Sequence, residues 1–160
     1  MKTPKKPSRR DVALGLAALG SAPANAAEAA AKRLNPAGLL TPRGYTHVVS
    51  VTPGRTIYVS GQISANAKGE VVGKGDIKAQ TTQVFENLRV ALAAAGASPK
   101  DVVKITFFVV NLKTEDLPAI RGVRDAFFAG LEPPASTLVG VTALASPDWM
   151  IEVEAIAVVA

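Results

Sequence analysis

The stretch that decides the fold runs from Pro133 to Val158 and reads PPASTLVGVTALASPDWMIEVEAIAV. Residues 136–143 and 150–158 are rich in β-branched side chains and flank the turn residues Ser146-Pro147-Asp148, so we expect two strands joined as a hairpin. The second run alternates with a period of two. This alternation places Glu152 and Glu154 on one face, about 7 Å apart. They are either a candidate general acid–base pair or the solvated end of a strand.

The chain upstream of this stretch supplies the rest of an α+β domain. The long strand at 101–111 is apolar on both faces from Ile105 onward. The predicted order from residue 45 is β-β-α-β-α-β-β, with one mixed sheet and two helices on one face. The remaining elements are a hairpin of 46–51 and 55–63 across Pro53-Gly54, a helix capped by Asp76 that ends at Ala95 before Gly96, and a helix capped by Thr114 or Asp116 with Pro118 in its first turn.

Two helices can cover only one face of such a sheet. The uncovered face is predicted to carry the apolar residues Phe108, Val110, Ile156 and Val158. Because so much exposed apolar surface is unusual for a monomer, we expect an oligomer.

Composition limits the chemistry that is available to this chain. The 160 residues are 48% hydrophobic and contain no cysteine, which excludes disulfides and thiolate chemistry. His47 is the single histidine, which argues against a histidine metal site or a Ser-His-Asp triad, and no metal or cofactor is expected. Residues 1–26 carry five of the 18 basic residues and one of the 13 acidic ones, so the rest has a net charge of only +1. This near-neutral domain argues against nucleic acid as a partner.

The N-terminal residues 1–26 are predicted to be an export signal. Ser8-Arg9-Arg10-Asp11-Val12 resembles the twin-arginine signature, residues 12–19 are a short apolar run, and small residues precede a cleavage site after Ala26. The apolar run is too short for stable membrane insertion, so we expect a periplasmic or secreted protein. The alternative is an uncleaved amphipathic tail. Residues 27–44 are predicted to be a linker whose alanine-rich part is briefly helical, and the domain is predicted to span 45–160.

Several short motifs together resemble the RidA/YjgF family of reactive-intermediate deaminases. The motifs cover almost the whole domain in the family's order, and they are Ile57-Tyr58-Val59-Ser60-Gly61-Gln62-Ile63, Gln80 with Asn87-Leu88, Gly96 with Asp101-Val102-Val103-Lys104, Pro134-Ala135, and Ile151-Glu152-Val153-Glu154-Ala155-Ile156-Ala157. The resemblance implies a chorismate-mutase-like fold, a homotrimer with its sheets facing inward, and ligand clefts between subunits. It also implies hydrolysis of 2-iminobutanoate or 2-aminoacrylate to the 2-oxo acid and ammonia, without metal or cofactor.

The resemblance also assigns candidate site residues. Tyr45 is expected to line the cleft, Ser60-Gly61 to present backbone groups to a small carboxylate or imine ligand, and Glu152 to activate the attacking water. Alternatively, Ser60-Gly61 is only a tight bend in a strand.

The chain departs from the family at Ser136, where active members carry an arginine that holds the substrate carboxylate. A serine cannot form the bidentate, charge-assisted pair that a guanidinium forms. Arg121 or Arg124 is a candidate replacement, and the alternative is that both are solvated helix residues paired with Asp125 or Glu115. Two functions therefore fit the sequence: an imine or enamine hydrolase, and a non-catalytic trimer that binds a small metabolite or acts as a chaperone-like surface.

Overall fold

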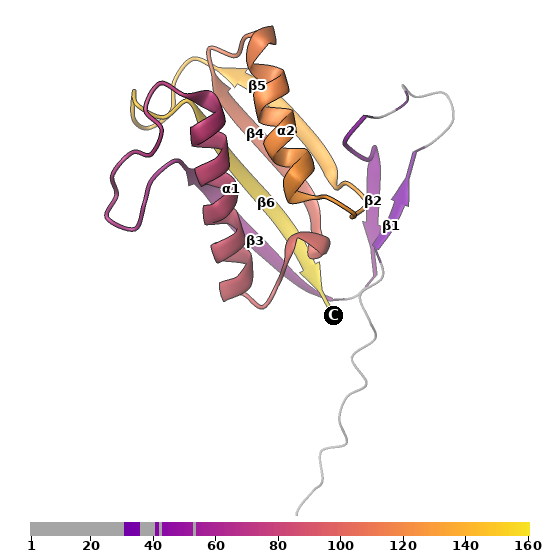
Figure 1. The fold of residues 1–160 in the computed structure, drawn as a ribbon. Coiled ribbons are helices and arrows are strands. Elements are labelled where there is room, and N and C mark those ends of the chain that lie inside the picture. The colour runs from indigo at the N-terminus through magenta and orange to yellow at the C-terminus, as the bar shows by residue number, and fades with distance from the viewer. Residues whose placement is uncertain (1–30, 36–40, 42, 53) are drawn as a thin grey trace, which may run out of the picture.

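The computed structural model describes residues 31–35, 41, 43–52 and 54–160 (Figure 1). The predicted signal segment 1–26 lies outside these residues. None of the described helices is long and apolar enough to cross a membrane.

The core of the molecule is a four-stranded sheet in the order β3-β6-β4-β5. Neighbouring strands are antiparallel except β4 and β5, which are parallel, so the sheet is mixed. Both long helices lie on one face of it (Figure 1). The elements are β3 (Arg55–Ile63), α1 (Ile77–Ala94), a 3₁₀ turn (Pro99–Asp101), β4 (Val102–Val110), a 3₁₀ turn (Thr114–Asp116), α2 (Leu117–Phe127), β5 (Ala135–Val141) and β6 (Ile151–Val159). The predicted mixed sheet, its element order and its helical layer are confirmed.

The first helix begins and ends where its sequence predicts. The Asp76 carboxylate accepts hydrogen bonds from the backbone N–H groups of Lys78 and Ala79, at 2.9 and 3.0 Å, which satisfies two donors of the first turn. After the helix, Gly96 has a φ of +71°, a left-handed conformation that glycine adopts without steric cost.

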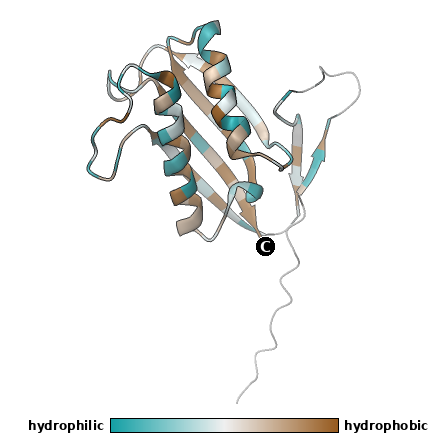
Figure 2. Cartoon of the chain, in the orientation of Figure 1, coloured by the Kyte–Doolittle hydropathy of each residue, from teal (hydrophilic) through white to brown (hydrophobic). Residues whose placement is uncertain are grey.

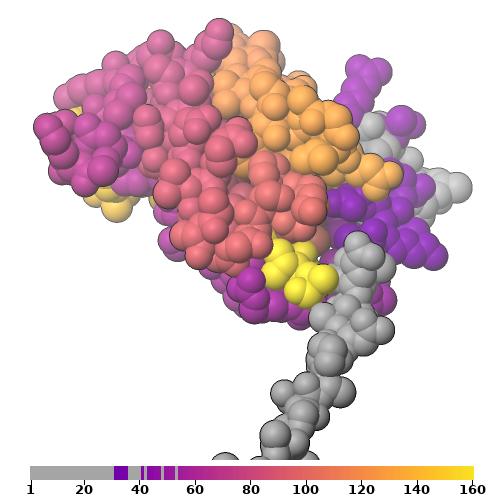
Figure 3. Space-filling model, turned by 60° about the horizontal axis from the view of Figure 1, so that its bottom comes forward, coloured from indigo at the N-terminus to yellow at the C-terminus, as the bar shows by residue number. Residues whose placement is uncertain are grey.

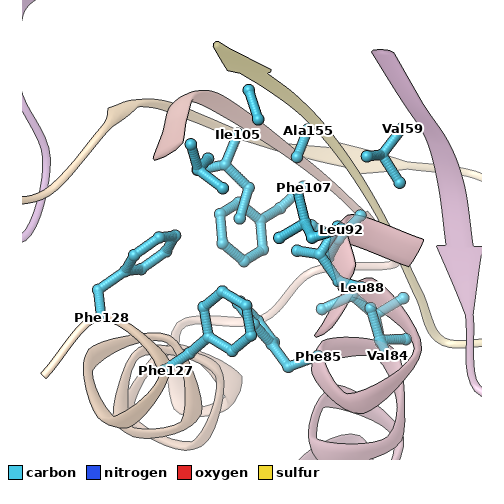
Figure 4. Close-up of a cluster of buried hydrophobic side chains, with 14 of the residues drawn as sticks. Val59, Val84, Phe85, Leu88, Leu92, Ile105, Phe107, Phe127, Phe128 and Ala155 are labelled. Carbon is cyan, nitrogen blue, oxygen red and sulfur yellow. The ribbon is translucent and has the colours of Figure 1, made fainter. Parts of the chain in front are cut away.

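The helices bury aromatic side chains against the sheet. Phe85 of α1 lies between Phe107 of β4 and Phe127 of α2, with ring centroids 6.0 and 4.9 Å away (Figure 4). Full burial of a phenylalanine side chain stabilises a fold by about 1.5–3 kcal/mol. Hydrophobic residues follow the central strands, while both helices have mixed faces (Figure 2). This is the layer arrangement expected when helices cover only one side of a sheet.

Both predicted hairpins are wrong. The strands β5 and β6 are not neighbours, because β4 lies between them and pairs with each. Near the N-terminus, β2 (Val48–Val51) does not pair with β3. It pairs with β1 (Ala31–Leu34) in a separate two-stranded sheet. The strand β1 also replaces the helical piece expected in the linker, of which residues 27–30 lie outside the described part of the chain.

The sheet face without helices carries apolar residues, as predicted, together with the ionisable residues Lys104, Glu152 and Glu154. It carries Tyr58, which is 79% exposed, with Val139 at one edge and the half-buried Phe108, Val110 and Ile156 between them. We call these five residues the open face. Val158, which was also expected there, is already buried within the chain, near the C-terminal end of β6 that Figure 3 shows in yellow.

Candidate functional site

A β-bulge in β3 builds the first part of the candidate site. Val59 pairs with Ala155 and Gln62 with Val153, so Ser60 and Gly61 together face the single residue Glu154 of β6. A bulge leaves the extra residue outside the ladder and aims nearby groups in new directions. Ser60 and Gly61 therefore leave the regular ladder, and the Ser60 carbonyl accepts a hydrogen bond from the Gln62 side chain at 3.1 Å.

The Glu152 carboxylate lies directly against this bulge. A β-carbon added to Gly61 would lie 2.5 Å from Cδ and 2.8 Å from Cγ of Glu152, and closer still to Oε1. Only glycine leaves room for the carboxylate in this position. Glu152 is half-buried and lies opposite Ile63 and Phe108 on the face that the helices leave uncovered. The structure thus brings together three predicted residues: Ser60, Gly61 and Glu152.

Tyr45 and Arg121 form a second part of the site, beside β5 and α2. They line a pocket of about 680 Å³ whose other described residues are Thr41, Arg43, Gly44, Arg124 and Asp125, and which we call the arginine pocket. Thr46 fixes the segment that carries Tyr45, because its N–H donates to the Pro134 carbonyl at 3.0 Å and its hydroxyl to the Pro133 carbonyl at 2.7 Å. The start of β5 therefore holds Tyr45 opposite α2.

The arginines of this pocket differ in their pairing. The Arg124 side chain is only 12% exposed, and its Nε and Nη2 donate to Asp125 Oδ1 at 2.9 and 2.7 Å. Gly44 packs on its guanidinium, since a β-carbon there would lie 2.8 Å from Cζ. Arg43 and Arg121 are exposed and make no ion pair with any residue that the structure describes. The expected pairing with Asp125 therefore holds for Arg124 but not for Arg121.

Sequence reasoning missed Arg43 and Gly44 because both fall in the predicted linker. The available signal was their position, since Arg43-Gly44 immediately precedes the predicted cleft residue Tyr45.

Ser136 lies apart from Glu152. It pairs with the buried Ile105 of β4, so it stands on the helix-covered side of the sheet. It is half-buried and follows Ala135, which bridges to Thr46, but it is not among the described residues that line the arginine pocket.

Within one chain the two parts of the site do not meet. The sheet order places β4 between the strand of Glu152 and the strand beside Tyr45, and Glu152 is not among the described residues that line the arginine pocket. The Glu152 carboxylate and the guanidinium groups of the arginine pocket could converge on one ligand only if a second copy of the chain supplies one of these two parts.

One further ionisable group lies on the uncovered side of the sheet. The Lys104 ammonium donates a hydrogen bond to the Thr137 hydroxyl. Burial lowers the pKa of Lys104 below its usual 10.5, and the nearby Glu154 carboxylate opposes this shift. Among the residues that the structure describes, no group of acidic or histidine side chains could hold a metal ion.

Comparison with known proteins identifies the family. A family model described as Endoribonuclease L-PSP matches residues 38–159. The chain is 37% identical over 115 residues to a 2-iminobutanoate/2-iminopropanoate deaminase of Dermatophagoides farinae, covering 72% of this chain and 85% of the relative. It is 39% identical over 115 residues to the Escherichia coli K12 protein of the same name, covering 70% and 86%.

Solved structures agree with this match. The Rid-family protein YyfB of Yersinia pestis has a TM-score of 0.77 at 42% identity, covering 81% of this chain and 98% of that protein. The E. coli YjgF gene product has a TM-score of 0.58 at 39% identity, covering 66% and 81%. The chain belongs to the RidA/YjgF family.

Proposed function

We propose that this protein hydrolyses small imines or enamines of the 2-aminoacrylate or 2-iminobutanoate type to the 2-oxo acid and ammonia. The observation that carries the proposal is the Glu152 carboxylate, which packs against Gly61 in the bulge of β3. The names of the two deaminase relatives support the same chemistry.

In the proposed reaction, Glu152 acts as a general base toward water. As the water oxygen bonds to the carbon of the protonated imine, Glu152 accepts a water proton and the C=N π electrons move to the nitrogen, which gives a neutral carbinolamine. Glu152 then gives its proton to the amine nitrogen, the C–N bond breaks and ammonia leaves, and the hydroxyl proton passes to the Glu152 carboxylate as the C=O bond forms. Backbone groups of Ser60-Gly61 orient the substrate at the bulge.

The substrate carboxylate is assigned to Arg121. Its guanidinium is exposed, has no ion-pair partner among the described residues and shares the arginine pocket with Tyr45. An arginine binds a carboxylate through two parallel hydrogen bonds, which the neutral hydroxyl of Ser136 cannot reproduce.

The complete cleft is proposed to form between subunits of a homotrimer. Glu152 and Arg121 lie on different sides of the molecule, and the apolar open face supplies a surface for assembly. In a ring, each subunit would present its Glu152 to the arginine pocket of a neighbour.

Subunit mixing tests this arrangement. Glu152→Gln and Arg121→Ala are each expected to lose most activity as pure trimers. In randomly mixed trimers about one site in four receives both native residues, so about a quarter of the wild-type rate should return. Wild-type protein taken through the same mixing step is the control. No recovery in confirmed mixed trimers would place both residues in one chain or remove one of them from the site.

A non-catalytic trimer that binds a small metabolite, or acts as a chaperone-like surface, is the second candidate. It is favoured by the neutral Ser136 at the position where active family members carry the carboxylate-binding arginine. It predicts that Glu152→Gln changes neither ligand affinity nor the rate of ammonia release from 2-aminoacrylate. It also predicts that Ser136→Arg does not increase that rate, whereas an active site should gain from the added clamp.

Residues 1–26 are proposed to direct twin-arginine export to the periplasm or the exterior. The mature chain should begin near Ala27 when it is sequenced from native cells. An intact N-terminus in the cytosol would contradict export.

A further inference from the structure

We infer that the arginine pocket takes a ligand with two carboxylates, so that the preferred substrate class is the imine of a dicarboxylic amino acid. This inference rests on the proposed function for the reaction but not for the binding. It starts from the charges of the pocket, which contains three arginines and one carboxylate among its described residues.

Asp125 accounts for one arginine only. Its Oδ1 accepts hydrogen bonds from both Nε and Nη2 of Arg124, and Gly44 covers that guanidinium. Arg124 is therefore a fixed wall of the pocket rather than a free anion site. Arg43 and Arg121 remain, and neither makes an ion pair with a described residue.

Two unneutralised guanidinium groups in one pocket repel each other and together attract negative charge. A single carboxylate can form a bidentate pair with only one of them. A ligand with two carboxylates can satisfy both, and arginine suits planar carboxylates better than lysine does.

The size of the pocket agrees with such a ligand. About 680 Å³ lies within the range of small-molecule sites and exceeds what one carboxylate and a methyl group need. With Arg121 on the carboxylate next to the imine carbon, Arg43 is left for the carboxylate of the side chain. Arg43 is then a specificity-determining residue that has no role in bond breaking.

Calorimetry with two 2-oxo acids of equal carbon number tests the binding. 2-Oxoglutarate carries a second carboxylate where 2-oxopentanoate has a methyl group. We expect the full chain to bind 2-oxoglutarate at least tenfold more tightly, as one additional charge-assisted pair predicts. Arg43→Gln should remove this difference and leave 2-oxopentanoate affinity within about twofold, whereas Arg121→Gln should weaken both ligands.

Lys68→Gln is the charge-matched control. Lys68 is exposed in the loop before α1, and its loss removes one positive charge far from the arginine pocket. It should change neither affinity. Equal affinity of the two acids for the wild-type protein, or equal weakening of both by Arg43→Gln, would overturn the inference. A phosphate-bearing 2-oxo acid that binds more tightly than 2-oxoglutarate would overturn the choice of a dicarboxylate.

Turnover separates this inference from the proposed function. Imines generated in situ from glutamate and from 2-aminobutyrate are followed by ammonia release. Preferential binding of 2-oxoglutarate without turnover of either imine would uphold the dicarboxylate site and refute the hydrolase. Turnover of both imines at equal efficiency, without preferential binding of 2-oxoglutarate, would uphold the hydrolase and refute the dicarboxylate site.

Discussion

Replacing Gly61 with alanine should separate catalysis from stability in this protein. The new β-carbon would lie 2.5 Å from Cδ of Glu152, so the two groups cannot keep their present positions. The carboxylate is the mobile end of a flexible side chain, and it will rotate away before the backbone moves. A side chain forced off its rotamer costs about 0.5–1.5 kcal/mol. The lower backbone entropy of the unfolded alanine chain returns about 0.4–1 kcal/mol.

The expected net change in the free energy of unfolding is therefore within about 1 kcal/mol. The rate should change far more, because a displaced general base costs about 10²–10⁴-fold in kcat. Thermal unfolding and ammonia release from 2-aminoacrylate, measured on the same preparation, give the two quantities. Gly122→Ala is the control, since a β-carbon there meets nothing within 4 Å; a glycine replaced inside a helix should gain about 0.5–1 kcal/mol and keep its kcat.

A double variant shows whether the effect acts through Glu152. Gly61→Ala should lower kcat no further in a Glu152→Gln background, because the base is already absent. A Gly61→Ala protein with kcat within about twofold of wild type, or one whose loss adds fully to that of Glu152→Gln, would refute the reasoning.

Three further predictions concern assembly, pH and the arginine pocket. Val110→Asp should give monomers by light scattering, because burying its charge in an interface at the open face would cost the trimer about 3–5 kcal/mol. The control variant Val90→Asp, which adds the same charge on the exposed side of α1, should remain trimeric. At pH values between the lowered pKa of Lys104 and 10.5, the unfolded chain binds more protons than the folded chain, so this lysine makes the free energy of unfolding rise with pH. Lys104→Met should remove that rise in melting experiments, and a pH profile equal to that of the wild type would contradict the prediction. Gly44→Ala should destabilise the protein by about 1–2 kcal/mol, because its φ of +72° is strained for alanine, and should weaken 2-oxoglutarate binding by shifting the Arg124 guanidinium.

The sequence predicts the elements well because local patterns determine them. Asp76 caps α1, Gly96 follows it, and the alternation of buried and half-buried residues along β4 and β6 appears in the structure as expected. Strand pairing is a different matter. Nothing local in β5 or β6 indicates that β4 lies between them, because that order depends on crossovers that span many residues.

The same limit applies to the site. The motif around Ser60-Gly61 marks a bend, but its contact with Glu152 depends on the register of β3 and β6. Arg43 could not be connected to Arg121 from the sequence, since 77 residues lie between these two arginines. The tertiary fold alone brings them to one pocket.

The separation of Glu152 from the arginine pocket makes the site depend on assembly if the cleft forms between copies. Because the sheet order keeps Glu152 away from the arginines of its own chain, a single subunit holds the two parts of the site but not the complete cleft. Held apart by β4 and β5, the base keeps its place against Gly61 and the arginines stay available for the ligand. Assembly would then create the site by placing one copy's Glu152 beside another copy's pocket while burying the open face. Activity per chain should therefore fall on dilution in step with trimer dissociation, whereas an activity independent of concentration through that transition would return both groups to a single chain.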